Sequence, residues 1–324
     1  MSALHWLRRW GISLASLALG LATLFVFRRG LPHVGWIVGY VLLLWLLVAV
    51  VGELRAPLEA RGRQLVVGAG EYGIQTLYHN LLLFVLPAYY ASATLTSLNA
   101  GFLGAVAVGA LVTAIDPWYR AIVQPRPWVG YLLLGLSIFA ALNVALPLVG
   151  IRPIMALLGS AALAALALTP AFRRRGAVSW TRAHASAVVV GAVAMVAVWN
   201  GRALVPPAPL FLARAVVARD VVDLEPVDPA TGRLGGAAVA GWAGLVAYTP
   251  VHAPAGLRQH IEHVWRRDGR EIGRVALSPI YGGRAQGFRT WSRRLEPPVP
   301  GRYEVDVRTA SGQLIGRLRF RVAR

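Results

Sequence analysis

Polar side chains recur along one side of the third apolar stretch of the chain. At 100° per residue, Glu71, Gln75, Tyr78 and His79 fall within about 100° of one another on a helix. An ionisable group inside a membrane helix costs about 2.5–3.5 kcal/mol by insertion scales, so it normally faces a bundle interior or a cavity. Asp116 ends the next apolar stretch, which runs back in the opposite direction. These five residues could therefore form a polar cluster, with a proton relay, an ion path or a ligand pocket built around Glu71, His79 and Asp116.

The same residues have a second interpretation, in which they only hold helices together. Buried side-chain hydrogen bonds between membrane helices contribute roughly 0.6–2 kcal/mol each, and Asp116 could pair with Arg120. No metal site is expected at His79, because three or four ligands with usable spacing are missing. No cofactor is predicted, and the common catalytic and nucleotide-binding motifs are not found.

A second set of candidate residues lies in the C-terminal part of the chain. His263 and Trp265 fall on one face of a strand, because alternate side chains point to opposite sides. We expect Trp265 to be buried on a central strand, with a neutral His263 hydrogen-bonded beside it to the acidic loop that ends at Glu225. Arg289 and Trp291 also share a face, and a tryptophan on a central strand of a sandwich usually belongs to the core. The alternative for these two residues is an exposed aromatic–arginine platform for a glycan, a peptide or a lipid headgroup.

Composition excludes several classes of protein. Of the 324 residues, 56% are hydrophobic and 15% are charged, whereas an ordinary soluble domain has roughly 25% charged residues. A wholly soluble protein is therefore not expected. The chain has no cysteine, which excludes disulfides, thiolate metal sites and thiol nucleophiles. The net charge of +19 comes from arginines that mostly flank apolar runs, whereas nucleic-acid binding needs a basic face or stripe. No nucleic-acid partner is predicted.

The elements that would position the first cluster are apolar runs close to the roughly 20 residues that cross a bilayer. Seven such runs occur, at about 11–27, 32–52, 68–91, 99–116, 128–148, 152–171 and 184–201. With the N-terminus in the cytoplasm, eleven arginines fall in cytoplasmic segments and four in outer segments near the membrane. This distribution favours that orientation. An odd number of spans then places the C-terminal region outside the cytoplasmic membrane, which in a bacterium means the periplasm or the cell surface.

The second cluster belongs to a region of different pattern. We expect a transmembrane domain over 1–202, a proline-rich linker over 203–209, and a β domain over 210–324. Alternating hydrophobicity predicts strands at about 210–218, 242–252, 258–267, 271–278, 286–295, 302–309 and 314–322. Asp268-Gly269 predicts a hairpin turn between two of them. Seven short strands separated by turns indicate an immunoglobulin-like sandwich. The expected fold is therefore a membrane α-helical bundle followed by an all-β domain.

Both halves carry motifs that resemble bacterial families of unknown function. The C-terminal motifs are Glu225-Pro226, Tyr248, His263-x-Trp265-x-x-x-Gly269, Arg289-Thr290-Trp291-Ser292, Gly301-x-Tyr303-x-Val305-x-Val307, Gly312 and Phe320. They resemble a periplasmic-type β domain that often follows membrane segments. The N-terminal motifs are Glu71-Tyr72, Gln75-Thr76, His79-Asn80 and Asp116-Pro117-x-Tyr119. They are similar to an uncharacterised polytopic membrane domain that is sometimes paired with it. Neither resemblance implies an activity, a substrate or a catalytic residue.

Two functions follow from these patterns. The favoured one is non-enzymatic: the helices anchor a β-sandwich that binds a protein partner or membrane complex, a glycan, or an anionic lipid surface. It is motivated by the 18 arginines and 10 acidic residues of 203–324, a net charge of +8 close to a bilayer. The rival is a membrane enzyme or transporter that uses Glu71, His79 and Asp116, with the β domain as a regulatory module.

Overall fold

The computed structural model describes residues 34–323, which form two compact units. Of these residues, the helical unit holds 34–87, Leu103–Leu146 and Met155–Gly201. The β unit holds Ala88–Phe102, Pro147–Ile154 and 202–323. The first expected span, 11–27, lies outside the described residues.

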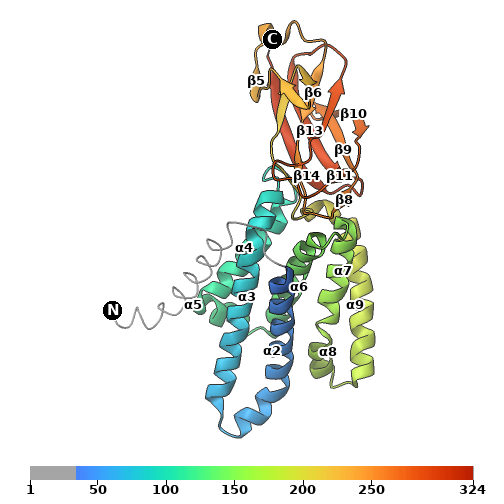
Figure 1. Ribbon diagram of the computed structural model, residues 1–324. Helices are drawn as coiled ribbons and strands as arrows, with labels where there is room; N and C mark the ends of the chain where they lie inside the picture. The colour runs from blue at the N-terminus through green and yellow to red at the C-terminus, as the bar shows by residue number, and fades with distance from the viewer. Residues whose placement is uncertain (1–33, 324) are drawn as a thin grey trace, which may run out of the picture. The chain divides into compact units, whose positions relative to one another are not determined.

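Helices make up the N-terminal part of the described chain (Figure 1). They are α2 (Val34–Ala60), α3 (Gln64–Ser92), α4 (Ala100–Ala114), α5 (Asp116–Trp118), the π-helix η2 (Tyr119–Val123), α6 (Pro127–Leu148), α7 (Pro153–Leu166), α8 (Thr169–Gly176), α9 (Trp180–Asn200) and the 3₁₀-helix η3 (Arg202–Leu204). The apolar stretches predicted from the sequence are therefore largely helical where the structure describes them, apart from breaks at Ile115 and at 167–168.

The expected count of seven membrane spans is not supported. Within 34–323, four segments are long and apolar enough to cross a bilayer, namely α2, α6, Pro153–Gly176 and α9. A fifth is possible if α4 and the helical turns after it form one span, although the two parts meet at 97°. At that break Ile115 is extended and Pro117 starts the next helix. Helix α3 is long enough, but its polar residues lower its mean hydropathy.

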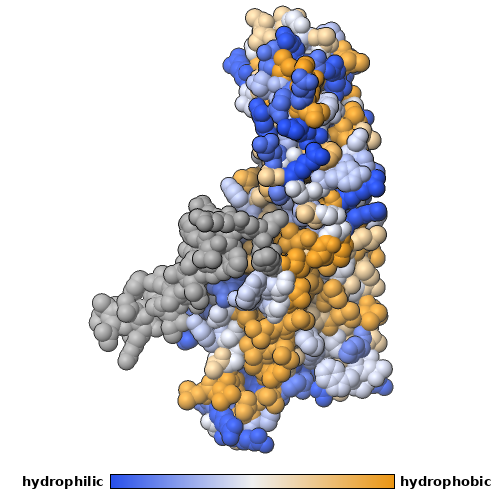
Figure 2. Space-filling model, in the orientation of Figure 1, coloured by the Kyte–Doolittle hydropathy of each residue, from blue (hydrophilic) through white to orange (hydrophobic). Residues whose placement is uncertain are grey.

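The surface of the helical unit is apolar. Figure 2 shows hydrophobic residues over most of its visible face, with hydrophilic residues gathered where α2 and α3 are joined. Large side chains are exposed along the helices, including Leu42 (59%) on α2 and Val193 (64%) on α9. A soluble protein rarely leaves so large a contiguous apolar surface in water. These helices are compatible with a membrane protein.

Small residues allow the helices to approach one another closely. A Cβ atom added at Gly109 of α4 would lie 3.1 Å from the Leu82 side chain of α3. At Gly191 of α9 it would lie 3.6 Å from Ala165 of α7. Both glycines are buried. These positions are therefore used for packing within the chain, because a larger side chain would push the backbones apart.

The C-terminal region is rich in strands arranged in several sheets (Figure 1). The larger sheets have the orders β10-β9-β13-β14-β5 and β12-β6-β2, and three two-stranded sheets pair β1 with β7, β11 with β8 and β3 with β4. The strands are β1 (Phe211–Leu212), β2 (Val216–Ala218), β3 (Asp220–Val222), β4 (Glu225–Val227), β5 (Gly232–Leu234), β6 (Leu245–Tyr248), β7 (Val251–His252), β8 (Arg258–Gln259), β9 (Ile261–Arg267), β10 (Arg270–Ala276), β11 (Ile280–Tyr281), β12 (Trp291–Arg294), β13 (Gly301–Thr309) and β14 (Leu314–Val322). A short helix, α10 (Gly236–Val239), follows β5.

The sequence-based strand assignment agrees best with the long strands. The strands predicted at 302–309 and 314–322 correspond to β13 and β14, and Asp268-Gly269 forms the predicted turn between β9 and β10. Both turn residues have positive φ, +50° and +83°, as the type I′ turn requires. Strands β3, β4, β5 and β11 were not predicted, because two or three residues are too few to show an alternating pattern.

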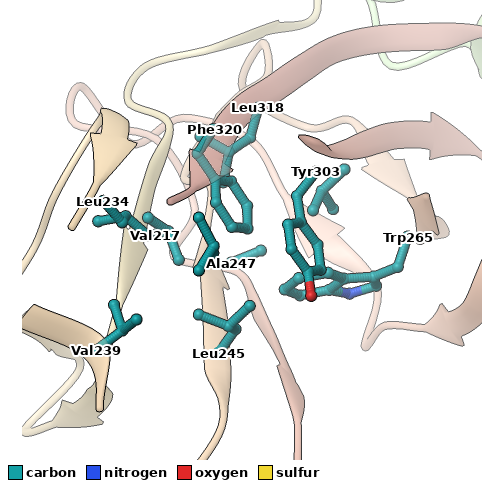
Figure 3. Close-up of a cluster of buried hydrophobic side chains, with 11 residues drawn as sticks. Val217, Leu234, Val239, Leu245, Ala247, Trp265, Tyr303, Leu318 and Phe320 are labelled. Atoms are coloured by element: carbon teal, nitrogen blue, oxygen red, sulfur yellow. The ribbon is translucent and has the colours of Figure 1, made fainter. Parts of the chain in front are cut away.

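The two larger sheets enclose a hydrophobic core. Figure 3 shows Tyr303, Phe320 and Trp265 of the five-stranded sheet packed near Ala247 and Leu245 of β6. The rings of Tyr303 and Phe320 stack with centroids 5.0 Å apart, and Trp265 meets Phe320 edge-on. Trp265 is 1% exposed on β9, between β10 and β13. The predicted burial of this tryptophan on a central strand is confirmed.

The β unit includes segments that connect the apolar helices. Asn99, between α3 and α4, donates from Nδ2 to the Leu314 carbonyl oxygen at 3.3 Å. Arg202 contacts the Ser311 carbonyl, and Gln313 donates to the Val205 carbonyl at 3.3 Å. The segment predicted as a proline-rich linker is packed rather than free, since residues 205–210 are buried. The turn between β13 and β14 is thus held against the chain that leaves α9.

Replacing Trp265 by Ala should lower the free energy of opening of the β domain by about 3–5 kcal/mol, the range for removing a large aromatic side chain from a core. Hydrogen–deuterium exchange of the β9 and β13 peptides, measured on the full-length protein in detergent micelles, reports this opening. Leu295→Ala is the control, because Leu295 is 77% exposed. Unchanged protection in Trp265→Ala would show that Trp265 contributes little to the core.

Candidate functional sites

Gln75 and Asp116 of the predicted intramembrane cluster contact each other. The Gln75 side-chain amide donates to Asp116 Oδ1 at 2.7 Å and to the Thr113 carbonyl oxygen at 3.0 Å. The second bond reaches the last turn of α4, whose end exposes backbone oxygens without a helical partner. Gln75 therefore joins α3 to the break that follows α4. Asp116 thus accepts a hydrogen bond from Gln75.

Tyr78 and His79 are directed to other helices. The Tyr78 hydroxyl donates to the Gly130 carbonyl oxygen of α6 at 3.2 Å. The His79 Nδ1 atom lies 3.5 Å from the Ala110 carbonyl oxygen of α4. Both side chains are almost completely buried, at 3% and 1% exposed. Each thus joins α3 to a different neighbour.

Glu71 has a partner that the sequence did not indicate. Its carboxylate lies 2.9 Å from Arg55 Nη1 on α2, and Arg55 also pairs with Glu59. Glu71 and Arg55 border a hollow of about 280 Å³ that is also lined by Tyr78, together with Tyr119, Gln124 and Tyr131. Gln75, His79 and Asp116 do not line it. The five predicted residues therefore do not form one site.

Arg55 was missed because α2 is longer than its apolar run. The sequence predicted a helix ending near residue 52, whereas α2 continues to Ala60. One further turn of helix brings Arg55 to the face that meets α3. The charge pair itself has no signal in the sequence, because its partners lie in different elements.

The predicted β-domain cluster is also divided. His263 and Trp265 lie inside the core, where His263 is fully buried. The Trp265 indole donates to Ser292 Oγ at 2.8 Å, and His263 Nδ1 lies 2.7 Å from the same oxygen. The other ring nitrogen, Nε2, lies 2.9 Å from Thr249 Oγ1. The expected partner in the acidic loop near Glu225 is therefore wrong: two small hydroxyl side chains of the facing sheet satisfy this imidazole.

These contacts favour a neutral imidazole. Burial lowers the pKa of His263 from 6.5 to about 4. Ser292 can accept from Trp265 and donate to Nδ1, which leaves Nε2–H to donate to Thr249. The network has hydrogen-bond partners for both ring nitrogens, and its role in the core is structural.

Glu225, Arg289 and Trp291 lie outside the core, so the expectation that Trp291 is a core residue is wrong: β12 turns Ser292 inward and Trp291 to the other face. Arg289 Nη2 is 2.9 Å from Glu225 Oε1, and the guanidinium also lies beside Tyr248. The hydrogen bonds to Glu225 and Tyr248 raise the pKa of Arg289. Trp291 stacks on Tyr248 with ring centroids 6.5 Å apart. The structure therefore brings these three predicted residues together, around a tyrosine hydroxyl that donates to the Leu224 carbonyl oxygen.

Beside this group is a hollow of about 430 Å³. Its lining includes Leu224, Arg284, Phe288, Arg289 and Trp291. The guanidinium carbon of Arg284 lies 4.7 Å from the centre of the Phe288 ring. The volume of the hollow falls in the range of small-ligand sites, which usually combine apolar walls with a few polar groups. We call this feature the Trp291 hollow.

The rim of the Trp291 hollow carries backbone strain. Asp223 and Leu224 form the turn between β3 and β4, with φ angles of +49° and +64°. Asparagine, aspartate or glycine usually occupies such left-handed positions. A leucine in this conformation costs about 1 kcal/mol of conformational free energy. Leu224 is also 50% exposed. An apolar side chain is thus held in an unfavourable conformation where it borders the hollow.

Two family models match the chain. Residues 2–233 match a family of unknown function, DUF5924. The chain belongs to DUF5924. A second family model, described as a protein of unknown function (DUF2914), matches residues 258–322 of this DUF5924 member. The match to uncharacterised N-terminal and C-terminal families agrees with the resemblance seen in the sequence. No curated protein matches the chain.

The buried His263 predicts how the β domain responds to acid. Its pKa is lower in the folded state than in the unfolded chain, so the unfolded chain binds more protons between pH 6.5 and about 4. The stability associated with neutral His263 is complete above pH 6.5 and is lost as the pH falls through this window. The expected loss is about 3 kcal/mol, since each pKa unit corresponds to about 1.4 kcal/mol.

The measurement is hydrogen exchange of β9 in the full-length protein between pH 7 and 4, corrected for the intrinsic exchange rate. In the His263→Asn variant, the protection of β9 should change less with pH between 6.5 and about 4. The variant is needed because burial also lowers the pKa of His252, which contributes with the same sign. An identical dependence in the variant and the parent protein would show that His263 does not cause the loss.

Proposed function

We propose that this protein is a membrane-anchored binding protein of a bacterial cell envelope. The apolar helices lie in the cytoplasmic membrane with the N-terminus inside, and an immunoglobulin-like β-sandwich lies on the outer side. The arginine distribution supports this orientation, and the two core-enclosing sheets support the sandwich. The observation that carries a binding role is the Trp291 hollow, because it combines half-buried aromatic side chains, guanidinium groups and a strained rim.

The chemistry of the Trp291 hollow fits an acidic sugar. An aromatic face such as that of Trp291 or Phe288 can cover the apolar face of a sugar ring. A guanidinium can bind a carboxylate through two parallel hydrogen bonds. Arg284 is exposed and has no ion pair with a carboxylate among residues 34–323. The ligand proposed is therefore a carboxylated sugar unit of an envelope glycan, with Arg284 as its charged contact.

Strain at Leu224 supports the same proposal. An unfavourable backbone conformation persists where the surrounding structure requires it, and such positions are often found at binding sites. Here the Tyr248 hydroxyl holds the Leu224 carbonyl at 3.1 Å. The tyrosine thereby fixes the turn that places the leucine side chain on the rim of the hollow.

Trp291→Ala should weaken binding of a carboxylated glycan by at least about tenfold, because it removes the stacking surface. Binding of soluble peptidoglycan fragments that contain N-acetylmuramic acid would be measured by calorimetry on the full-length protein in detergent micelles. Leu224→Gly should also weaken binding while leaving the domain as stable or more stable, because glycine adopts positive φ without strain. Val299→Ala, at an exposed position outside the hollow, is the control. Equal affinities in all three variants would contradict the proposed site.

A second candidate function rests on the hollow beside Glu71. The Glu71–Arg55 pair and the tyrosines lining it could hold a small polar substrate, as a transporter or a membrane enzyme would require. His79 and Asp116, the other two residues of that hypothesis, would then position α4 rather than touch the substrate. We favour the binding role, because Gln75, Tyr78 and His79 each contact a neighbouring helix or helix end.

Glu71→Gln separates the two functions. If Glu71 is structural, the variant should cost less than about 1 kcal/mol, since Arg55 is 57% exposed and exposed ion pairs contribute little. Its midpoint of thermal unfolding in detergent and the cellular phenotype should then match the parent protein. Glu71→Leu, which cannot hydrogen-bond, should be less stable than Glu71→Gln. A well-folded Glu71→Gln protein that has lost uptake or turnover would support the transporter or enzyme instead.

A further inference from the structure

Three arginines stand side by side across neighbouring strands of the five-stranded sheet. Arg302 on β13 is paired in register with Arg321 on β14, and Arg321 is paired with Arg233 on β5. All three are exposed. They line one surface hollow of about 950 Å³, together with the acidic residues Asp268 and Glu304. We call these three residues the arginine row.

The positive charge of the arginine row is not balanced by ion pairs. Among residues 34–323, none of the three arginines forms an ion pair with a carboxylate, although the two acidic residues lie nearby. Glu304 is paired with Arg319 at 2.9 Å. An oxygen of Asp268 accepts a hydrogen bond from the backbone N–H of Arg302 at 2.9 Å. Both carboxylates are therefore already engaged by other groups.

The same sheet face shows what a balanced arrangement looks like. Asp306 lies further along β13, is fully buried, and forms ion pairs with Arg266, Arg308 and Arg317. Burial raises the pKa of its carboxyl, but the hydrogen bonds and charges of Arg317 and Arg308 outweigh this and hold the pKa below its usual range. Arginines are therefore compensated in the middle of the sheet and uncompensated at its end.

Like charges that face each other on neighbouring strands, without a counter-charge, destabilise the sheet. Neighbouring strands lie about 4.8 Å apart, and directly opposed like charges destabilise a sheet. An anion placed over the row would remove this repulsion. Guanidinium groups bind phosphate through planar, paired hydrogen bonds. A ligand with several adjacent phosphates could contact two or three of the arginines at once.

The position of the arginine row limits the source of that ligand. The turn between β13 and β14 is held by Arg202 and Val205, which directly follow α9. The row lies at the opposite ends of the same two strands, eight residues from Ala310 along β13, or about 26 Å at the rise of a strand. It is thus remote from the point where the chain leaves its last apolar helix. This placement favours a phosphorylated polymer over the headgroups of the anchoring bilayer.

We propose that the arginine row binds adjacent phosphate groups of an anionic envelope polymer. The site is distinct from the Trp291 hollow, and the choice of an envelope polymer as its ligand rests on the proposed outward placement of the β domain. Its requirement is a ligand with at least two phosphates close enough to bridge Arg302 and Arg321. A single phosphate satisfies only part of the row and should bind more weakly.

The test uses the full-length protein in nanodiscs of zwitterionic lipid and sodium tripolyphosphate as the probe, with calorimetry as the readout. Tripolyphosphate should bind at least about tenfold more tightly than inorganic phosphate. The double variant Arg302→Gln, Arg321→Gln should weaken tripolyphosphate binding by at least about tenfold. The control, Arg214→Gln with Arg258→Gln, removes the same charge from two exposed arginines outside the hollow, and it should retain the parent affinity.

Hydrogen exchange of β13 and β14 keeps the test valid if a variant misfolds. The double variant of the row should be protected as well as the parent protein or better, because repulsion has been removed. If the row variant and the control variant lose tripolyphosphate affinity equally, binding depends only on the net charge of the protein, and the proposal is overturned. The absence of tripolyphosphate binding would also overturn it. The protein could instead bind phosphatidylglycerol vesicles through the arginine row, with no competition from tripolyphosphate. That result would assign the site to lipid headgroups and overturn the proposal of a polymer ligand.

Discussion

The hydroxyl of Ser292 joins the two larger sheets of the β domain, and the Trp291 hollow depends on this contact. From β12 it accepts the Trp265 indole N–H of β9 and meets the buried His263 imidazole. Because side chains alternate along a strand, inserting Ser292 into the core obliges Trp291 to point outward. The hydrogen bond that fixes the inner face of β12 thereby also fixes the aromatic surface of the hollow. Thr249, the residue that follows β6, extends this network, so the neutral histidine connects both sheets.

In the helical unit, too, buried polar side chains join neighbouring elements, here in an apolar surrounding where an unsatisfied polar group is costly. Gln75, Tyr78 and His79 project from one helix, yet each contacts a different partner on α4, α6 or the break between α4 and α5. A polar stripe on α3 therefore fixes the positions of two neighbouring helices. Glu71 differs, since it pairs with Arg55 at the border of a hollow. This pair is the part of the stripe best placed to contact a small molecule.

Sequence patterns predicted what depends on local geometry. The period of two placed Trp265 inside, and Asp268-Gly269 marked a turn that needs positive φ. Contacts between distant elements were not predictable in this way. Ser292 as the partner of His263 has no signal in the sequence, because the two residues lie on strands of different sheets and small hydroxyl side chains are mostly found on surfaces. The span count differs for another reason. The runs at 68–91 and 99–116 were counted by their length, whereas the polar residues of α3 lower its mean hydropathy and the chain bends sharply after α4.

The orientation of the β domain is the most direct test of an outward-facing binding protein. Paired fusions after Arg324, one to alkaline phosphatase and one to a fluorescent protein that matures only in the cytoplasm, report the side of the membrane on which the domain lies. The account predicts an active phosphatase and a dark fluorescent fusion, at equal expression levels. A fluorescent fusion with an inactive phosphatase would place the domain in the cytoplasm and contradict the account.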